Sequence, residues 1–564
     1  MEHYYTNERN HQILISLLKA HHINKVVASP GTTNSVFIGS IQNDPYFTIY
    51  SCVDERSAAY MACGLSFESG EPVVISCTGA TAARNYMSGA TEAYYSKLPI
   101  LILTSSQPNR AIGHLTPQVT DRTAPPKDTC RLSIELPTCK DKIEEWFCEI
   151  QANKALLELK RHGGGPVHLN LITTYSYNET TALTAKEFPD SRIIRRVSYT
   201  DKFPVLNGKR NAVFVGSHKK WTQELISAVE NFCEANNAVV LCDHTSNYQG
   251  KYRIPYALVI EQAALNRANT PAYAVDVLIH IGEVTGEEGA PRMIKSKETW
   301  RVSEDGEIRD YFKNMSRVFE MPEFTFFEHY SRSDKKETSY YNECIDVLKH
   351  YEGIRDTRFD EMPFSNSWIA QRIAPQIPNN TTVVLSILNT LRVWNYASFK
   401  PMVDLFCPVG GFGIDGASSL IVGASFAHPE KLYYGITGDL AFFYDLNSLG
   451  NRHIGNNLRI LLINNGLGFE FKKCYAMAYR LLEDEVEPYV AAAGHFGKRS
   501  SSLVRHYAED LGFEYLGASN KEEFDKTFKR FVSPELSERP MLFECFVTSE
   551  DESTALNIIQ NRDR

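Results

Sequence analysis

Strand-length apolar runs, each followed by a turn and then by a helical pattern, constrain the fold of this chain more than any other feature. In the first third these runs are KVVASPG, FTIYSCV, PVVISCTG and LPILILTSS, and helical patterns separate them. Short apolar runs bounded by Gly or Pro are typical of parallel strands that helices cover on both faces. The sequence therefore predicts an α/β fold built from doubly wound parallel sheets.

The same alternation continues and divides the chain into three parts. Strand-like runs recur as NAVFVGS, AVVLCDHTS and VDVLIHIGE in the middle, and as TTVVLSIL, KLYYGITGD, LRILLINNG and PMLFECFVT in the last third. A polar stretch over residues 174–202, interpreted as a linker, and the charged SRSDKKETSYYNE separate the parts. At about 150 residues per domain, 564 residues suffice for three or four domains. We predict domains over residues 1–180, 195–340 and 355–564.

The composition excludes several function classes. Charged residues make up 23% of the chain and the formal net charge is −9, which argues against a nucleic-acid-binding surface. No apolar stretch approaches the roughly 20 residues that cross a bilayer, so we expect no membrane insertion. The 12 cysteines include no C-x-x-C pair, and the N-terminus carries charges where a signal peptide is apolar. These features predict a cytoplasmic protein with free thiols.

Two strand ends in the last third carry the residues of a metal site. One strand runs into Gly438-Asp439, and 26 residues after Asp439 another strand runs into Asn465. Their carboxylate and amide, with a backbone carbonyl from the turn after Asn465, give three oxygen donors of the kind that Mg²⁺ prefers. Gly438 lets a diphosphate approach the backbone, and a helix expected to begin near Tyr444 points its positive end at it. The alternative is two ordinary Gly-containing turns.

This combination resembles the signature of the thiamine-diphosphate-dependent 2-oxo-acid decarboxylase/carboligase family, and the resemblance extends over nearly the whole chain. It implies a pyrimidine-binding domain, a middle domain without FAD, and a diphosphate-binding domain, in that order. It also implies that Asp439, Asn465 and the Leu467 carbonyl bind Mg²⁺. The further contacts that it implies for thiamine diphosphate are Pro30, Gly31, Thr78, Gly79, Gly413, Ile414, Gly438, Leu440 and Gly468.

The family also has a glutamate at the start of the helix after its second strand, and CVDERSAAYMACGLS places Glu55 there. A carboxylic acid bonded to the pyrimidine ring drives the tautomer that activates the cofactor. An apolar surrounding would raise the pKa of Glu55. The alternative is a helix N-terminal Glu favoured by the helix dipole. By the same resemblance, Ile414 is the apolar wedge that bends the cofactor, although an Ile in GGFGIDG could equally be plain core.

Among the subfamilies, the chain looks most like the menaquinone-pathway 2-succinyl-5-enolpyruvyl-6-hydroxy-3-cyclohexene-1-carboxylate synthase. The shared segments include SPGTTNS, GFGIDGASS and GDLAFFYDLNSL. The positions that read the substrate differ, because arginines of that synthase are replaced here by neutral residues or fall out of register. A neutral Asn or Gln cannot clamp a carboxylate bidentately, which argues against isochorismate as acceptor. The substrate contacts that we predict are Thr32, Thr33, Gln107, Asn389, Thr390 and Arg392.

Two further sets of polar side chains lie near these motifs. His114 and Gln118, in NRAIGHLTPQVTDR, occupy the loop that reaches the reacting carbon in the family. We predict catalytic roles for both, His114 as a proton donor or hydroxyl binder, with a surface histidine as the alternative. Lys472 and Lys473, after the NNG turn, are interpreted as a solvated charge pair.

The resemblance implies decarboxylation of a 2-oxo acid and transfer of the acyl anion equivalent to an acceptor. A simple 2-oxo-acid decarboxylase, an acetolactate-synthase-like enzyme and a non-catalytic relative remain open alternatives. The resemblance also implies a homodimer or a dimer of dimers, with Glu55 and Asp439 of one site coming from different copies. The sequence names neither the donor acid nor the acceptor.

Overall fold

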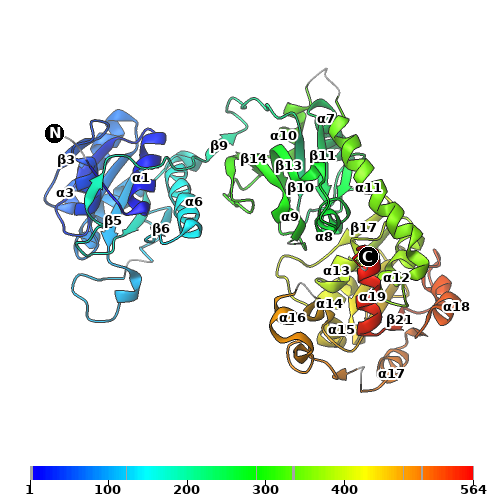
Figure 1. Cartoon of the computed structure of the whole chain (residues 1–564). Helices are drawn as coiled ribbons and strands as arrows, with labels where there is room; N and C mark the ends of the chain where they lie inside the picture. The colour runs from blue at the N-terminus through cyan, green and yellow to red at the C-terminus, as the bar shows by residue number, and fades with distance from the viewer. Residues whose placement is uncertain are drawn as a thin grey trace. The chain divides into compact units, whose positions relative to one another are not determined.

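The computed structural model describes residues 4–121, 124–287, 289–332, 337–473, 476–496 and 499–562. The chain forms two compact units, Met1–Val197 with Gly306–Val318, and Ser198–Asp305 with Phe319–Arg564. It passes between them within β9 (Arg195–Ser198), after Asp305, and within β15 (Met315–Glu320). Each unit is an α/β structure (Figure 1).

The first unit contains a six-stranded parallel sheet. Its strand order is β3 (Thr48–Ser51), β2 (Lys25–Ala28), β4 (Val73–Thr78), β5 (Ile100–Ser106), β7 (Val167–Ile172) and β6 (Leu132–Leu136). Its helices are α1 (Arg9–Ala20), α2 (Ser35–Ile41), α3 (Glu55–Ser69), α4 (Ala82–Asn85), α5 (Met87–Tyr95) and α6 (Lys142–Glu158).

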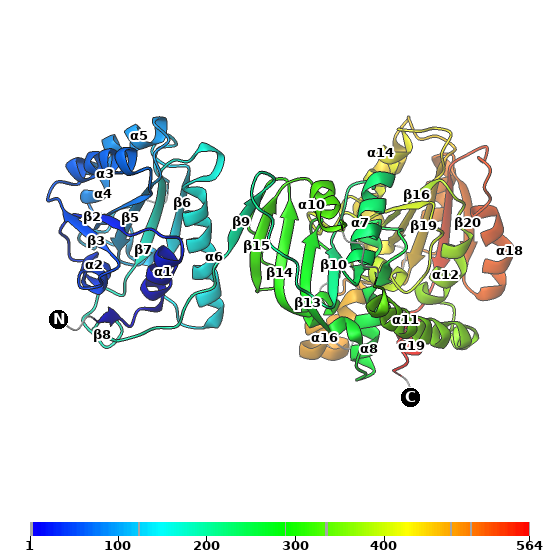
Figure 2. The same cartoon turned by 90° about the horizontal axis from the view of Figure 1, so that it is seen from above.

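Both faces of this sheet are covered (Figure 2). Alternate strand residues point to opposite faces, so Val26 and Val74 join the core under α1, α2 and α6. Their neighbours Val27 and Val73 join the second core, under α3 and α5. Continuous apolar strands are the expected result of this double burial.

The second unit contains two further parallel sheets. The middle sheet has β12 (Arg253–Pro255), β11 (Ala238–Cys242), β10 (Asn211–Val215), β13 (Ala274–Ile281) and β14 (Lys295–Ser303) in that order. The helices that accompany it are α7 (Gln223–Ala235), a π-helix over Ala257–Glu261, α8 (Gln262–Leu265), α9 (Gly289–Met293), α10 (Glu323–Tyr330) and α11 (Ser339–Thr357).

The last sheet has the order β17 (Val403–Phe406), β16 (Thr381–Leu385), β18 (Tyr433–Gly438), β19 (Leu458–Asn464), β21 (Met541–Phe546) and β20 (Glu514–Ala518). Its helices are α12 (Asn366–Ile373), α13 (Asn389–Trp394), α14 (Ala417–Ser425), α15 (Asp439–Tyr444), α16 (Met477–Leu482), α17 (Leu503–Asp510), α18 (Lys521–Phe531) and α19 (Ser549–Ile559). The strand order reverses direction between β16 and β18, and ligands of such sheets bind outside the strand ends at that point.

The predicted α/β class with three parallel sheets is confirmed. The linker prediction for residues 174–202 was too simple, because β8 (Leu183–Ala185) pairs antiparallel with β1 (Tyr5–Thr6) and β9 lies in the same stretch. The predicted domain boundaries stay predictions, and residues 333–336 of the charged stretch lie outside the described residues. The described cysteines are free, and no helix of the described ranges combines the length and apolarity needed to cross a bilayer.

Candidate active site

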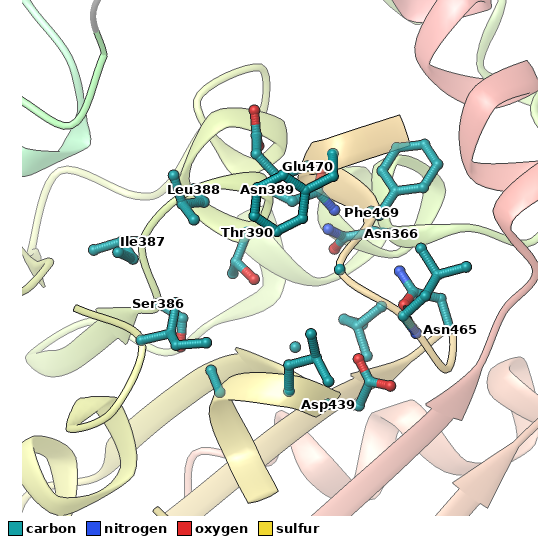
Figure 3. A pocket seen from close by; sticks show the side chains of 18 residues that line it. Asn366, Ser386, Ile387, Leu388, Asn389, Thr390, Asp439, Asn465, Phe469 and Glu470 are labelled. Atoms are coloured by element: carbon teal, nitrogen blue, oxygen red, sulfur yellow. Dashed lines mark hydrogen bonds between the residues drawn. The ribbon is translucent and has the colours of Figure 1, made fainter. Parts of the chain in front are cut away.

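A cavity of about 90 Å³ lies where β16, β18 and β19 end in the second unit (Figure 3). It sits at the reversal of strand order, where the fold predicts a ligand. Eighteen residues line it: Asn366, Ser386, Ile387, Leu388, Asn389, Thr390, Ile414, Gly438, Asp439, Leu440, Ala441, Ile463, Asn465, Leu467, Gly468, Phe469, Glu470 and Phe471.

Asp439 is the acidic residue at the end of β18. Its side chain is buried, and burial raises the pKa of its carboxyl to about 7. The nearby backbone N–H groups of Leu440 and Gly466 oppose this rise in pKa. The helix that was expected to begin near Tyr444 instead begins at Asp439 and ends at Tyr444, because the turn after β18 is shorter than predicted. The first turn of α15 therefore lies in the cavity wall.

The turn after β19 brings the amide and the carbonyl to the same cavity. Asn465 and Leu467 are both buried, and the Leu467 N–H donates to Asn465 Oδ1 at 3.2 Å. Gly466 between them has a φ of 75°, a conformation that favours glycine. The Leu467 carbonyl accepts the Phe469 N–H at 3.1 Å and keeps a second lone pair. The structure thus brings the three predicted metal donors to one cavity.

The loop after β16 supplies the opposite wall. Asn389 and Thr390 line the cavity as α13 begins. Leu388, just before them, has a φ of 62°, which is strained for a residue with a side chain. Such strain is typical of ligand-binding segments. Ile414, the predicted wedge, lines the same cavity.

Asn366 is a cavity residue that the sequence analysis missed. It is 1% exposed, and its Oδ1 accepts from Trp394 Nε1 at 3.0 Å. Its Nδ2 has no hydrogen-bond partner in the described structure, although it lies in the cavity lining. Its position follows from the cap of α12, where Ser365 Oγ accepts the Trp368 N–H at 3.2 Å. The S-N-S sequence signals that cap but not the cavity.

Helix α19 packs beside α12 (Figure 1). From α19, Glu552 accepts the backbone N–H of Asn366 at 3.2 Å. Burial raises the pKa of the Glu552 carboxyl from 4.5 to about 8. The folded state therefore keeps this proton after the unfolded chain has released it, so stability falls as pH rises from about 4.5 to about 8.

Glu552→Gln is expected to remove the loss of stability that accompanies rising pH. The difference in melting temperature between pH 5 and pH 8 should therefore become smaller. Glu550→Gln, an exposed change on the same helix, is the control. Thermal unfolding by circular dichroism at both pH values measures the effect. An unchanged difference in the Glu552 variant would contradict the assignment.

The predicted solvated lysine pair was wrong. Lys473 is 3% exposed, and its Nζ lies 2.8 Å from Glu470 Oε2. Lys472 pairs with Glu487 and is also largely buried. The charges are buried because carboxylates partner them, which two adjacent lysines in a sequence do not reveal. Arg392, predicted as a substrate contact, pairs with Glu470 Oε1 at 2.5 Å and lies outside the lining of the cavity at the strand ends.

In the first unit, the ends of β2, β4 and β5 gather the residues predicted for the pyrimidine side. A Cβ on Gly31 would lie 2.7 Å from Thr78 Cβ, so only glycine fits against that strand end. Thr33 is buried, bonds the Thr78 hydroxyl, and donates to the Ser105 carbonyl at 2.5 Å. Pro30, Gly79 and Gln107 continue these strand ends, and Thr32 is exposed beside them.

Glu55 begins α3, as predicted, with Asp54 as its N-cap. The carboxyl is half-buried, and its Oε2 accepts from Asn85 Nδ2 at 3.2 Å. His114 and Gln118 lie exposed on the loop after β5, and Gln118 has a φ of 62°. Among the described residues, no hydrogen bond joins either of these side chains to Glu55, and their roles stay predictions.

Sequence comparisons with known proteins point to the same cofactor. The family described as thiamine pyrophosphate enzyme, N-terminal TPP binding domain, matches residues 9–124. The 2-succinyl-5-enolpyruvyl-6-hydroxy-3-cyclohexene-1-carboxylate synthase of Phocaeicola vulgatus is 29% identical over 578 residues, covering 98% of each chain. The synthase of the same name from Bacteroides thetaiotaomicron is 28% identical over 577 residues, again 98% of each chain. The one from Flavobacterium johnsoniae is 27% identical over 478 residues, 82% of this chain and 84% of its own.

Over residues 9–124 the chain matches a thiamine-diphosphate-binding domain, which confirms the resemblance predicted from the sequence. The lining of the strand-end cavity fits the diphosphate end of that cofactor: an orphaned Asn366 amide can donate to a phosphate oxygen, and Asp439 is a buried acid that a cation would ionise. Within the described residues, no group of three or more His, Cys, Asp or Glu side chains could hold a metal ion. A set of one carboxylate, one amide and one carbonyl instead suits Mg²⁺ that also binds phosphate oxygens.

Proposed function

We propose that this enzyme uses thiamine diphosphate and Mg²⁺ to decarboxylate a 2-oxo acid and to transfer the acyl anion equivalent to an acceptor. The observation that carries the proposal is the convergence of Asp439, Asn465 and Leu467 on one cavity at the strand ends. Asp439, Asn465 and the Leu467 carbonyl would hold Mg²⁺, and Asn366 with the first turn of α15 would bind the diphosphate.

Other residues would orient and activate the cofactor. When bound, thiamine diphosphate supplies a carbon nucleophile and the electron sink for decarboxylation. Ile414, in the cavity wall, would support the cofactor's rings. Glu55 would donate a hydrogen bond to the pyrimidine ring and move the proton on which activation depends. Beside Ile414, apolar side chains such as Leu388 and Phe469 would exclude water.

A homodimer, or a dimer of dimers, would supply both halves of the site. The surface beside Glu55 supports this part of the proposal, because large apolar side chains are exposed along α3 and just before it. Val53 and Phe67 are each 78% exposed, Met61 is 56% exposed and Tyr60 is 47% exposed. Exposed apolar patches of this kind mark interaction surfaces. A second copy that covers α3 would also exclude water from Glu55.

The acceptor is expected to differ from isochorismate. The names of the relatives describe synthases of a succinylated cyclohexene carboxylate. In this chain Thr33 and Gln107 replace arginines expected from the resemblance, and Arg392 is already neutralised by Glu470. The positions at which arginines of the synthase would bind carboxylates therefore do not supply such a cation in this chain.

The test has two steps. Calorimetry should show thiamine diphosphate binding that strengthens when Mg²⁺ is added. The loaded enzyme should then release CO₂ from one member of a panel containing pyruvate, 2-oxobutyrate and 2-oxoglutarate. Product analysis with and without candidate aldehyde acceptors separates carboligation from simple decarboxylation, in which the free aldehyde accumulates. No binding of thiamine diphosphate under any condition would rule the proposal out.

A further inference from the structure

A second and larger cavity, of about 850 Å³, adjoins the strand-end cavity in the second unit. Glu470 and Phe471 line both. Residues of the π-helix, α8 and α9 form one wall of the larger cavity, and residues of α16 form the other. Its volume is that of a small-molecule site, and its shared wall places a ligand next to the proposed reaction centre.

The α16 wall is apolar and uncovered. No residue of α16 is buried, and Met477 and Leu481, four positions apart on one face, are 77% and 70% exposed. Leu482 and Val490 continue this wall, and Met293 faces the cavity from α9. Helices of folded proteins normally bury such a face. A concave apolar wall of this kind indicates a ligand with an apolar part.

The opposite side of the cavity carries more carboxyl groups than its buried cations can pair. Glu470 is held between Arg392, at 2.5 Å, and Lys473, at 2.8 Å. Glu287 Oε2 lies 3.7 Å from the same Arg392. Of the described carboxyl groups that line this cavity, these ion pairs leave that of Glu261 without a cation.

Glu261 lines the cavity with a half-buried side chain and forms no ion pair with any described residue. The Tyr396 hydroxyl donates to its Oε2 at a long 3.5 Å. The charged groups facing it are Glu287 after β13, Arg392 on α13, Glu470 and Lys473 after β19, and the exposed Arg292 on α9. Burial and the nearby Glu287 raise the pKa of Glu261 to about 8.

We propose that this cavity binds the acceptor substrate, with Glu261 holding a positively charged amino group and the α16 wall covering the apolar part. The inference rests on the proposed function, because it names the class of its acceptor. An ammonium group would pair with Glu261 and ionise it, whereas a carboxylate would face the carboxylate of Glu287 and be repelled. An acceptor that carries an ammonium group is consistent with the absence of the arginines that would bind carboxylates.

Calorimetry on the full-length protein at pH 7 tests the proposal with hexylamine, hexanol and hexanoate, which share one apolar chain. We expect hexylammonium to bind at least about tenfold more tightly than hexanol, and hexanoate to bind most weakly. Repeating the titration in buffers of different ionisation enthalpy should show release of about one proton per hexylammonium bound, because Glu261 must ionise. Equal binding of hexanol, tighter binding of hexanoate, or no binding of hexylammonium would overturn the proposal.

Three variants locate the binding. Glu261→Gln should reduce hexylammonium affinity to that of hexanol and abolish proton release. Leu481→Ser, at a side chain too exposed to disturb folding, should weaken hexylammonium and hexanol alike by a few fold. Glu485→Gln, an exposed carboxylate outside the cavity lining, should change neither. Unchanged hexylammonium affinity in the Glu261 variant would contradict the assignment.

Thiamine diphosphate binding, measured separately, keeps the two proposals apart. Intact cofactor binding without hexylammonium binding overturns the acceptor assignment alone. Hexylammonium binding at Glu261 without any cofactor binding overturns the proposed function and shows a cation-binding cavity in its place.

Discussion

Replacing Asp439 with alanine is expected to weaken Mg²⁺-dependent binding of thiamine diphosphate roughly hundredfold or more. The change removes the carboxylate at the end of β18, the one charged member of the proposed donor set. Asn465 and the Leu467 carbonyl would remain, but two neutral oxygens bind a divalent cation weakly. Calorimetric titration of thiamine diphosphate, with Mg²⁺ and again with EDTA, measures the loss directly.

The Asp439 variant should fold, which makes the binding result interpretable. Asp439 is 5% exposed, and without a cation a buried acid costs free energy, so alanine there is not expected to lower the melting temperature. Asp510→Ala, an exposed change at the end of α17, serves as the control and should bind the cofactor normally. If the Asp439 variant kept its Mg²⁺-dependent affinity, the ligand assignment would be wrong.

The features of this fold that the sequence predicts are local ones. The runs PVVISCTG and LRILLINNG signal β4 and β19 because a strand buried on both faces needs every residue apolar. The turn chemistry at Gly438-Asp439 and Asn464-Asn465-Gly466 is also local, and sheet topology then places both turns at one edge. These signals suffice to place Asp439 and Asn465 beside one cavity.

The features that the sequence does not reveal depend on contacts between distant residues. Asn366 reaches the cavity only because α12 packs beside α19 and its amide bonds Trp394. The buried Lys473 needs Glu470, and β8 needs β1, where Ala185 pairs with Tyr5. No local pattern reports such pairings, because a lysine or a short polar strand is compatible with solvent until its partner is known.

Glu55→Gln is expected to abolish turnover while leaving the affinity for thiamine diphosphate within about tenfold. The amide keeps the shape of the side chain and one hydrogen bond, but it cannot transfer the proton that activates the cofactor. Exchange of the cofactor's C2 proton for deuterium, followed by NMR after acid quench, reads the activation step separately from substrate binding. Glu68→Gln, an exposed change on the same helix α3, should leave the exchange unchanged. Unchanged exchange in the Glu55 variant would remove this residue from the mechanism.

Mixing the two inactive variants tests where the halves of the site come from. Suppose that Glu55 and Asp439 of one site belong to different copies in a dimer. A mixed dimer of Glu55→Gln and Asp439→Ala chains then has one site with both residues replaced and one site fully intact. After unfolding and refolding an equal mixture, half of the dimers are mixed, so about a quarter of wild-type activity should return. Activity can return only if a site takes residues from two copies. If each chain formed its own site, every chain in the mixture would carry one replaced residue in that site and would stay inactive.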